Sequence, residues 1–232
     1  MRLPTHVTIK EVGLRDGLQL VGAIVPTEVK VRLLHALHAA GLRAMEVTSF
    51  VSPRAVPQFG DAEAVARAAL ALPHLRVSAL IPNVRGFERA RDAGVRHCTV
   101  VIGATDRFNE RNVRMTVEES LVHLEAIAKG IRALPGASLE VGIAVAFGCP
   151  YTGAVAFDAV ARIVERARVL ELRAISLGDT IGVATPAQVA ATVARLMENH
   201  PDLTLALHLH DTRGMGLANV LAGCDAGVTM LD

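Results

Sequence analysis

Short apolar runs alternate along the chain with longer segments in which apolar residues recur at helical spacing. The short runs, which we predict to be strands, are residues 7–12, 44–48, 75–81, 96–102, 139–146, 174–177, 204–209 and 228–231. The longer segments, which we predict to be helices, are residues 27–41, 62–72, a segment holding Phe87 and Ala90, 116–134, 157–170, a segment after Pro186, and 217–226. This alternation is typical of βα units around a parallel sheet.

Composition narrows the class of protein. With 232 residues, of which 51% are hydrophobic, the chain is expected to fold as one domain over residues 1–232. A net charge of +1 and the absence of Trp argue against a nucleic-acid partner. No apolar run is long enough to cross a bilayer, so we expect no membrane partner and a cytoplasmic location. Cys98, Cys149 and Cys224 are too widely spaced for a zinc knuckle or a disulfide framework.

Two histidines near the end of the seventh predicted strand are the first candidates for chemistry. His208 and His210 alternate with apolar residues, and alternate residues of a strand point to the same face. Two neighbouring imidazoles can ligate a metal, although a histidine pair in a strand is more often structural. An Mg²⁺ or Mn²⁺ ion would also need an oxygen ligand from elsewhere in the chain.

The segment after the first predicted strand supplies such an oxygen. Arg15 and Asp16 set a cation beside a carboxylate, and Gly17 would allow a tight turn. Asp16 is a potential ligand of a divalent ion, and Arg15 could bind an oxyanion. The plainer interpretation is that Asp16 is a turn carboxylate and Arg15 its ion-pair partner.

With these motifs the chain resembles the metal-dependent lyases and Claisen-type synthases built on a TIM barrel, and among them the 3-hydroxy-3-methylglutaryl-CoA lyases. The matching segments run nearly end to end: residues 11–13, 15–19, 46–53, 56–58, 148–151, 176–182 and 208–212. Thr48–Pro53 and Gly148–Tyr151 favour the lyases over the synthases.

The resemblance implies an α/β fold, a TIM barrel of eight parallel strands, with its active site at the carboxyl ends of the strands. The candidate residues all follow or end a predicted strand. The resemblance implies a divalent cation, Mg²⁺ or Mn²⁺, on Asp16, His208 and His210, and an acyl-CoA substrate. It also implies cleavage of 3-hydroxy-3-methylglutaryl-CoA into acetyl-CoA and acetoacetate. A homodimer is our expectation for the assembly.

The remaining candidate roles are catalytic or substrate-binding. Arg15 would stabilise the enolate oxygen of the leaving acetyl-CoA, and Asp179, with His208 or Glu46, would act as base or proton relay. The expected substrate-binding residues are Gln19, Ser49, Ser176 and Thr180. Alternatively, Asp179 caps the next helix, and Ser49 and Ser176 are turn or cap residues. Glu46, a carboxylate inside an apolar strand, is expected to be paired.

Two departures from the resemblance leave the substrate open. The family's last metal ligand, an asparagine, and its loop cysteine lie beyond the eighth strand and have no counterpart before Asp232, so we expect an incomplete barrel whose last strand and C-terminal part are missing. Leu20–Val21 and Glu140–Gly142 also differ from the usual family residues. A related substrate such as citramalyl-CoA, an aldolase reaction on a hydroxy acid, and a catalytically silent barrel acting as a binding subunit are the alternatives.

Overall fold

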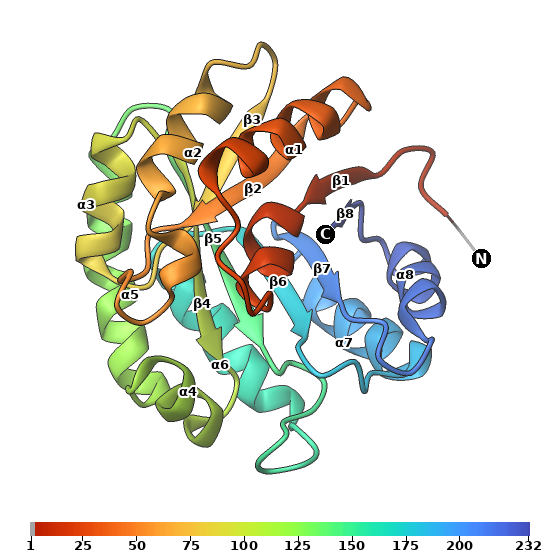
Figure 1. Ribbon diagram of the computed structural model, residues 1–232. Coiled ribbons are helices and arrows are strands. Elements are labelled where there is room, and N and C mark those ends of the chain that lie inside the picture. Colours follow the sequence, from red (N-terminus) through yellow and green to blue (C-terminus); the bar gives the residue numbers. More distant parts are fainter. Residues whose placement is uncertain (1–2) are drawn as a thin grey trace. The chain divides into compact units, whose positions relative to one another are not determined.

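The computed structural model describes residues 3–232 as eight parallel strands that close into a barrel in chain order (Figure 1). The strands are β1 (Thr8–Glu11), β2 (Ala44–Ser49), β3 (Arg76–Leu80), β4 (His97–Gly103), β5 (Ser138–Ala144), β6 (Ala174–Asp179), β7 (Thr204–Leu209) and β8 (Met230–Leu231). The helices are α1 (Thr27–Ala39), α2 (Ala62–Leu70), α3 (Val84–Asp92), α4 (Asp106–Val113), α5 (Val117–Arg132), α6 (Phe157–Val169), α7 (Pro186–Asn199) and α8 (Gly216–Asp225). The predicted α/β TIM barrel is confirmed.

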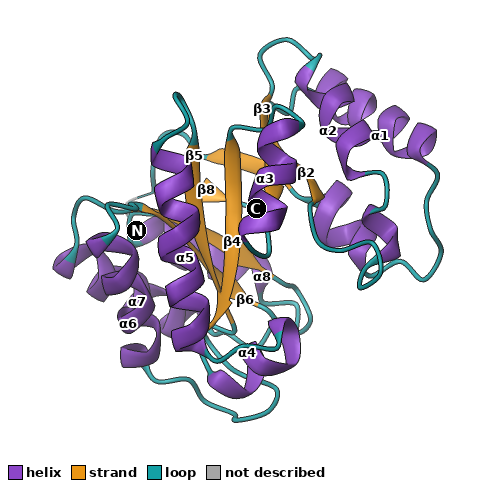
Figure 2. Cartoon of the chain, turned by 90° about the vertical axis from the view of Figure 1, so that its left-hand side faces the viewer, coloured by secondary structure: helices purple, strands orange, loops and turns teal. Residues whose placement is uncertain are grey.

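Helices and strands alternate along the chain, except that α4 and α5 both lie between β4 and β5 (Figure 2). A capping box precedes α5, because Thr116 N–H donates to Glu119 Oε2 at 2.7 Å and Glu119 N–H donates to Thr116 Oγ1 at 3.2 Å. No helix among residues 3–232 is long and apolar enough to cross a membrane.

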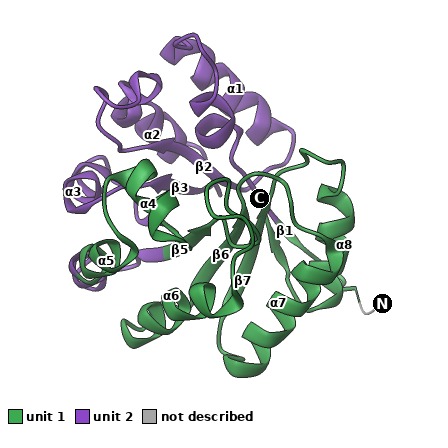
Figure 3. Ribbon diagram, turned by 90° about the horizontal axis from the view of Figure 1, so that it is seen from below, with its two compact units in different colours: residues 1–8, 101–125, 140–232 green, residues 9–100, 126–139 purple. Residues whose placement is uncertain are grey.

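Contacts divide the chain into two compact units (Figure 3). Unit 1 contains the residues up to Thr8 together with 101–125 and 140–232, and unit 2 contains residues 9–100 and 126–139. The boundaries pass through β1, β4, β5 and α5, so these elements contribute residues to both units.

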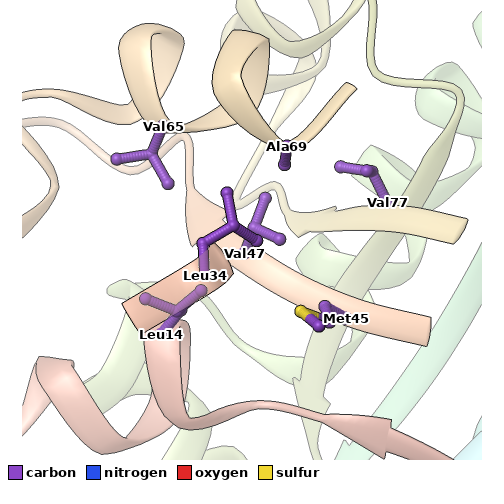
Figure 4. Close-up of a cluster of buried hydrophobic side chains, with 7 residues drawn as sticks. All are labelled: Leu14, Leu34, Met45, Val47, Val65, Ala69 and Val77. Atoms are coloured by element: carbon purple, nitrogen blue, oxygen red, sulfur yellow. The ribbon is translucent and has the colours of Figure 1, made fainter. Parts of the chain in front are cut away.

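The hydrophobic core of unit 2 lies between β2 and its covering helices (Figure 4). Met45 and Val47 on β2 pack in a fully buried cluster with Leu34 of α1, and the other members are Leu14, Val65, Ala69 and Val77. Burying one such aliphatic side chain contributes about 1.5–3 kcal/mol. Because neighbouring residues of a strand alternate, Glu46 points away from this cluster, to the inner face of β2.

In unit 1, the register between β6 and β7 shows which of their residues share the inner face of the sheet. Ser176 pairs with Ala206, and Gly178 pairs with His208. Leu207 faces the covering helix, since a Cβ at Gly223 of α8 would lie 2.2 Å from Leu207 Cδ1. His208 therefore points to the opposite, inner face of β7.

The structure corrects three expectations. The last strand is present, because β8 pairs with β7 and Thr8 N–H donates to the Thr229 carbonyl at 2.7 Å, so the prediction of an open barrel is wrong. Residues 106–113, for which no element was predicted, form α4. The tight turn expected at Gly17 is instead the end of a π-helical turn, Gly13–Gly17, and Gly17 lacks the positive φ that would require glycine. Met1 and Arg2, which the predicted domain 1–232 includes, lie outside the described residues.

Candidate metal and active site

In unit 2, one cation links two carboxylates at the ends of β1 and β2. Arg15 Nε donates to Glu46 Oε2 at 2.7 Å, and Arg15 Nη1 donates to Asp16 Oδ1 at 2.5 Å. The side chains of Arg15 and Glu46 are 11% and 2% exposed, so this ion pair is largely shielded from water. The expectation that Glu46 is paired is confirmed.

The backbone after β1 explains how Arg15 and Asp16 come to lie together. Gly13 N–H donates to Glu11 Oε1 at 2.6 Å, and a Cβ at Gly13 would lie 2.7 Å from the same oxygen, so a larger residue there would displace the Glu11 carboxylate. Asp16 N–H then donates to the Val12 carbonyl at 2.7 Å, while the buried Leu14 anchors the turn in the core. The turn thus places Arg15 against Glu46 of β2 and Asp16 against Arg15.

The charge of Glu46 affects the pKa of a neighbouring thiol. Its Oε1 atom is buried and has no hydrogen-bond partner among residues 3–232. Burial, and in second place the charge of Glu46, raises the pKa of the Cys98 thiol to about 12. Cys98 therefore stays protonated and is no nucleophile, whereas Glu46 has an oxygen available to accept a proton.

In unit 1, the two histidines of β7 face each other. His208 Nε2 lies 3.0 Å from His210 Nε2, and their ring centroids are 5.0 Å apart. His208 Nδ1 lies 2.7 Å from Asp232 Oδ1. Because an ionised carboxylate only accepts hydrogen bonds, Asp232 keeps a proton on Nδ1, and the Nε2 of a neutral His208 then carries a lone pair.

This arrangement suits metal ligands. A ligating histidine usually donates its second ring nitrogen to a carboxylate, which fixes the tautomer and the ring orientation. His208, with Asp232 behind it and the His210 nitrogen beside its Nε2, has that environment, so the imidazole pair fits a divalent cation. Sequence reasoning missed Asp232, and the only available signal was an acidic residue directly after the eighth strand.

Asp179 is buried, and both of its carboxylate oxygens accept hydrogen bonds from backbone N–H groups. It is 1% exposed, Oδ1 accepts from Val183 N–H, and Oδ2 accepts from Ala184 N–H, both at 2.9 Å. The carboxylate therefore folds the loop between β6 and α7 onto itself. This geometry favours the interpretation of Asp179 as a cap, although its carboxylate binds backbone N–H groups that precede Thr185, the N-cap residue of α7.

Thr180 also supports the backbone. Its Oγ1 accepts from Val145 N–H at 2.8 Å. Val145 follows β5 and has φ of 53°, a left-handed conformation that costs a β-branched residue free energy. The Thr180 hydroxyl thus stabilises a strained residue at the end of β5.

The other predicted substrate-binding residues differ in environment. Ser49 Oγ accepts from Val51 N–H at 3.3 Å, as in a turn. Ser176 is 5% exposed, lies between Gly142 and Ala206 in the strand register, and has no side-chain hydrogen bond within residues 3–232. Gln19 is exposed beyond the π-helical turn. Of the three, Ser176 has the buried, uncommitted hydroxyl expected of a ligand contact.

Comparison with known proteins covers the whole candidate site. The sequence model of the HMGL-like family matches residues 6–232. Hydroxymethylglutaryl-CoA lyase, mitochondrial, of Rattus norvegicus is 40% identical over 232 residues, covering 99% of this chain and 70% of that protein. The 3-hydroxy-3-methylglutaryl-CoA lyase, cytoplasmic, of Mus musculus is 38% identical over 230 residues, covering 99% of this chain and 67% of that protein.

Solved structures agree with the sequence comparison. The HMG-CoA lyase of Bacillus subtilis superposes with a TM-score of 0.95 at 37% identity, covering 100% of this chain and 78% of that one. An HMG-CoA lyase from Acinetobacter baumannii, in complex with coenzyme A and 3-methylmalate, superposes with a TM-score of 0.92 at 34% identity, covering 98% and 74%. The carboxyl transferase domain of Rhizobium etli pyruvate carboxylase, at 19% identity and a TM-score of 0.75, shares the fold.

Proposed function

Since the chain belongs to the HMGL-like family of lyases, we propose that it cleaves 3-hydroxy-3-methylglutaryl-CoA into acetyl-CoA and acetoacetate by a retro-Claisen reaction. The observation that carries this proposal is the His208–His210 pair, in which the Asp232 carboxylate lies at Nδ1 of His208. The chain that contains this pair matches, over nearly its whole length, proteins named as this lyase. A relative crystallised with coenzyme A supports an acyl-CoA as the substrate.

The proposed cofactor is one divalent cation, Mg²⁺ or Mn²⁺, with Asp16, His208 and His210 as its protein ligands. When bound, such an ion polarises a substrate hydroxyl and lowers its pKa. The carboxylate supplies the hard oxygen that these metals prefer, and the two imidazoles supply neutral nitrogen ligands. In this proposal Asp232 positions His208 and does not itself contact the ion.

We assign the proton transfer to Glu46. Its Oε1 is buried and has no hydrogen-bond partner within residues 3–232, while Oε2 is held by Arg15. A carboxylate fixed at one oxygen keeps the other oriented toward the inner face of β2, where it can accept and return a proton. Arg15 supplies positive charge for an enolate oxygen while it holds Glu46 in place.

The predicted roles of the β6 residues change in this proposal. Asp179 and Thr180 become positioning residues, because their oxygens accept from the backbone of the loops after β6 and β5. Ser176 becomes the substrate contact, since its hydroxyl is buried and uncommitted. Ser49 and Gln19 are proposed as further substrate contacts.

A related substrate is the second candidate, and the inner face of unit 1 favours it. Gly142, Ser176 and Ala206 are neighbours in the strand register, so this wall carries little side-chain volume. Such a wall leaves room for a differently branched 3-hydroxyacyl-CoA, for example citramalyl-CoA.

The test is release of acetoacetate from 3-hydroxy-3-methylglutaryl-CoA with Mg²⁺ or Mn²⁺ present, compared with the same protein after chelation. His208→Ala should abolish turnover, whereas His35→Ala, an exposed histidine on α1, should leave it unchanged. Citramalyl-CoA is assayed in parallel. Metal-bound wild type that cleaves neither thioester would refute the proposed reaction.

A further inference from the structure

A β-bulge in β2 places Ser49 on the same face of the sheet as Glu46. Glu46 pairs with Ser78 of β3. Ser49 pairs with Leu80, so three steps along β2 match two steps along β3. Ser78 and Leu80 are alternate residues of a strand and point to one face, which their partners on β2 share. Ser49, the last residue of β2, therefore points to the inner face that carries Glu46.

The hydroxyl of Ser49 is held on one side and available on the other. Its Oγ accepts from Val51 N–H at 3.3 Å, while its hydrogen has no acceptor among residues 3–232. Ser49 is 1% exposed, so this hydrogen is shielded from bulk water. A buried hydroxyl with an uncommitted hydrogen can donate to a substrate oxygen. The direction of that donor depends on where the chain places Val51.

Arg89 of α3 fixes the backbone that follows Ser49. Its Nη1 donates to the Phe50 carbonyl at 3.3 Å and to the Val51 carbonyl at 3.1 Å. A Cβ at Gly86 of α3 would lie 3.1 Å from the Phe50 carbonyl oxygen, so this side of the carbonyl is closed to water. If the guanidinium were removed, the Phe50 carbonyl would have to shift to find a new donor, and Ser49 would shift with it.

The guanidinium is itself oriented by α2 and by the Phe50 ring. Arg89 Nε donates to Glu63 Oε1 at 2.8 Å, and Nη2 lies 2.8 Å from the same oxygen. The Arg89 Cζ atom lies 5.5 Å from the centroid of the buried Phe50 ring. One planar group thus joins α2, α3 and the end of β2, and a lysine could not make all of these contacts at once.

We propose that Arg89 is a positioning residue for the proposed reaction. It holds the backbone after β2 so that Ser49 donates its hydroxyl hydrogen to an oxygen of the acyl-CoA substrate. The role of Ser49 rests on the proposed function, whereas its position rests on the bulge and on Arg89. Because the Ser49 contact is made in the ground state as well as in the transition state, loss of either residue raises KM and leaves kcat nearly unchanged.

The test is a double-mutant cycle in the metal-dependent cleavage assay. Arg89→Met keeps the aliphatic stem but removes the donors, and it should raise KM about ten-fold, the loss expected for one hydrogen bond. Ser49→Ala should have an effect of similar size. If Arg89 acts through Ser49, the double variant has the KM of Ser49→Ala alone. A rise of about a hundred-fold in the double variant, or an unchanged KM in Arg89→Met, overturns the proposal.

Amide hydrogen exchange provides a readout that needs no turnover. In Arg89→Met, Val51 N–H should exchange about ten-fold faster than in wild type, while the buried Val47 of β2 keeps its protection. Unchanged exchange at Val51, or equal acceleration throughout unit 2, overturns the proposal. Arg89→Lys keeps one donor for the carbonyls and should fall between wild type and Arg89→Met, so it replaces the methionine variant if that variant folds poorly.

Arg91→Met is the matched control. Arg91 lies on the same helix, its side chain is 45% exposed, and its Nη2 lies 2.8 Å from the neighbouring Asp92 Oδ1. This variant should leave both the KM and the exchange of Val51 N–H unchanged.

The positioning role and the proposed reaction can fail separately. If wild type cleaves no thioester, the reaction is wrong, and exchange at Val51 still decides whether Arg89 holds the segment Ser49–Val51. If the thioester is cleaved but neither KM nor exchange depends on Arg89, the positioning role is wrong and the reaction stands.

Discussion

The ends of β1 and β2 and the ends of β6 and β7 bury polar side chains in different ways. In unit 2, Arg15 is the cation for two carboxylates, Asp16 and Glu46. In unit 1, Asp179 is held by two backbone N–H groups, and His208 is held by His210 and Asp232. The first group depends on opposite charges, whereas the second depends mainly on backbone donors and imidazole nitrogens.

This difference decides how each group responds to mutation. Removing one partner of a buried ion pair leaves an uncompensated charge, which costs more than a lost neutral hydrogen bond. Variants of the unit 2 group should therefore lose stability and activity together. Variants of the histidines should lose metal binding while the fold persists.

The largest effect is expected for Arg15→Met, which removes the cation but keeps much of the side-chain volume. It leaves Glu46 buried without its partner, and the free energy of unfolding should fall by about 3–5 kcal/mol. Urea unfolding monitored by circular dichroism measures this. Arg54→Met, an exposed arginine after β2, is the control and should change stability by less than about 0.5 kcal/mol.

If Arg15→Met were as stable as wild type, the two carboxylates would not depend on Arg15, and the contrast between the two groups would fail. A double variant, Arg15→Met with Glu46→Gln, sharpens the test. It removes the stranded charge as well and should regain part of the lost stability.

The next largest effect is expected for Asp179→Asn. In the wild type, each carboxylate oxygen accepts from a backbone N–H, whereas the amide would turn its NH2 group toward one of these donors. Two donors would then face each other, so the free energy of unfolding should fall by about 2–3 kcal/mol. Asp158→Asn, whose side chain is 89% exposed, is the matched control and should be neutral. A merely catalytic Asp179 would instead lose turnover at full stability.

Particular segments show how much of the fold could be predicted from the sequence. β7 spans the predicted residues 204–209, because Leu205–Leu207 form a continuous buried apolar run that is typical of a barrel strand. Helix α4 was not predicted, because it lacks an apolar stripe and is held by a buried amide. Asn109 Nδ2 donates to the carbonyls of Met115 and Thr116 and to Ser120 Oγ, and Oδ1 accepts from Gly103 N–H.

The site shows the same division. Motif reasoning selected Arg15, Asp16, Glu46 and the two histidines, because residue types and strand ends are visible in a sequence. It left the role of Asp179 in the β6 loop open between base and cap, and it missed Asp232, because the partners of a carboxylate depend on loop conformation and strand pairing. Neither property is encoded in a local pattern of residues.

A smaller effect on stability, but a clear one on metal binding, is expected for Asp232→Asn. The amide can still accept or donate at His208 Nδ1, so the free energy of unfolding should change by less than about 1 kcal/mol. Metal affinity should fall about 10- to 100-fold, because the carboxylate no longer fixes the imidazole tautomer. Isothermal titration with Mn²⁺ measures this, and Asp202→Asn, an acidic residue exposed before β7, is the control.

The smallest effect at neutral pH, and the finest probe of the charge on Glu46, concerns Cys98. Its pKa is raised from 9.0 to about 12, chiefly by burial and then by Glu46. Below pH 9 both the folded and the unfolded thiol are protonated, so Cys98 adds no pH dependence there. From pH 9 to about 12 only the unfolded chain releases this proton, and stability should therefore fall by about 1.4 kcal/mol per pH unit on account of this group.

Cys98→Val should remove that part of the slope in unfolding measurements between pH 9 and 11, and Glu46→Gln should reduce it slightly, since burial is the larger cause. Identical slopes for wild type and Cys98→Val would mean that the thiol ionises normally in the fold. Neither burial nor the charge of Glu46 would then raise the pKa of Cys98, and the charge-based account of the β1 and β2 ends would lose this independent support.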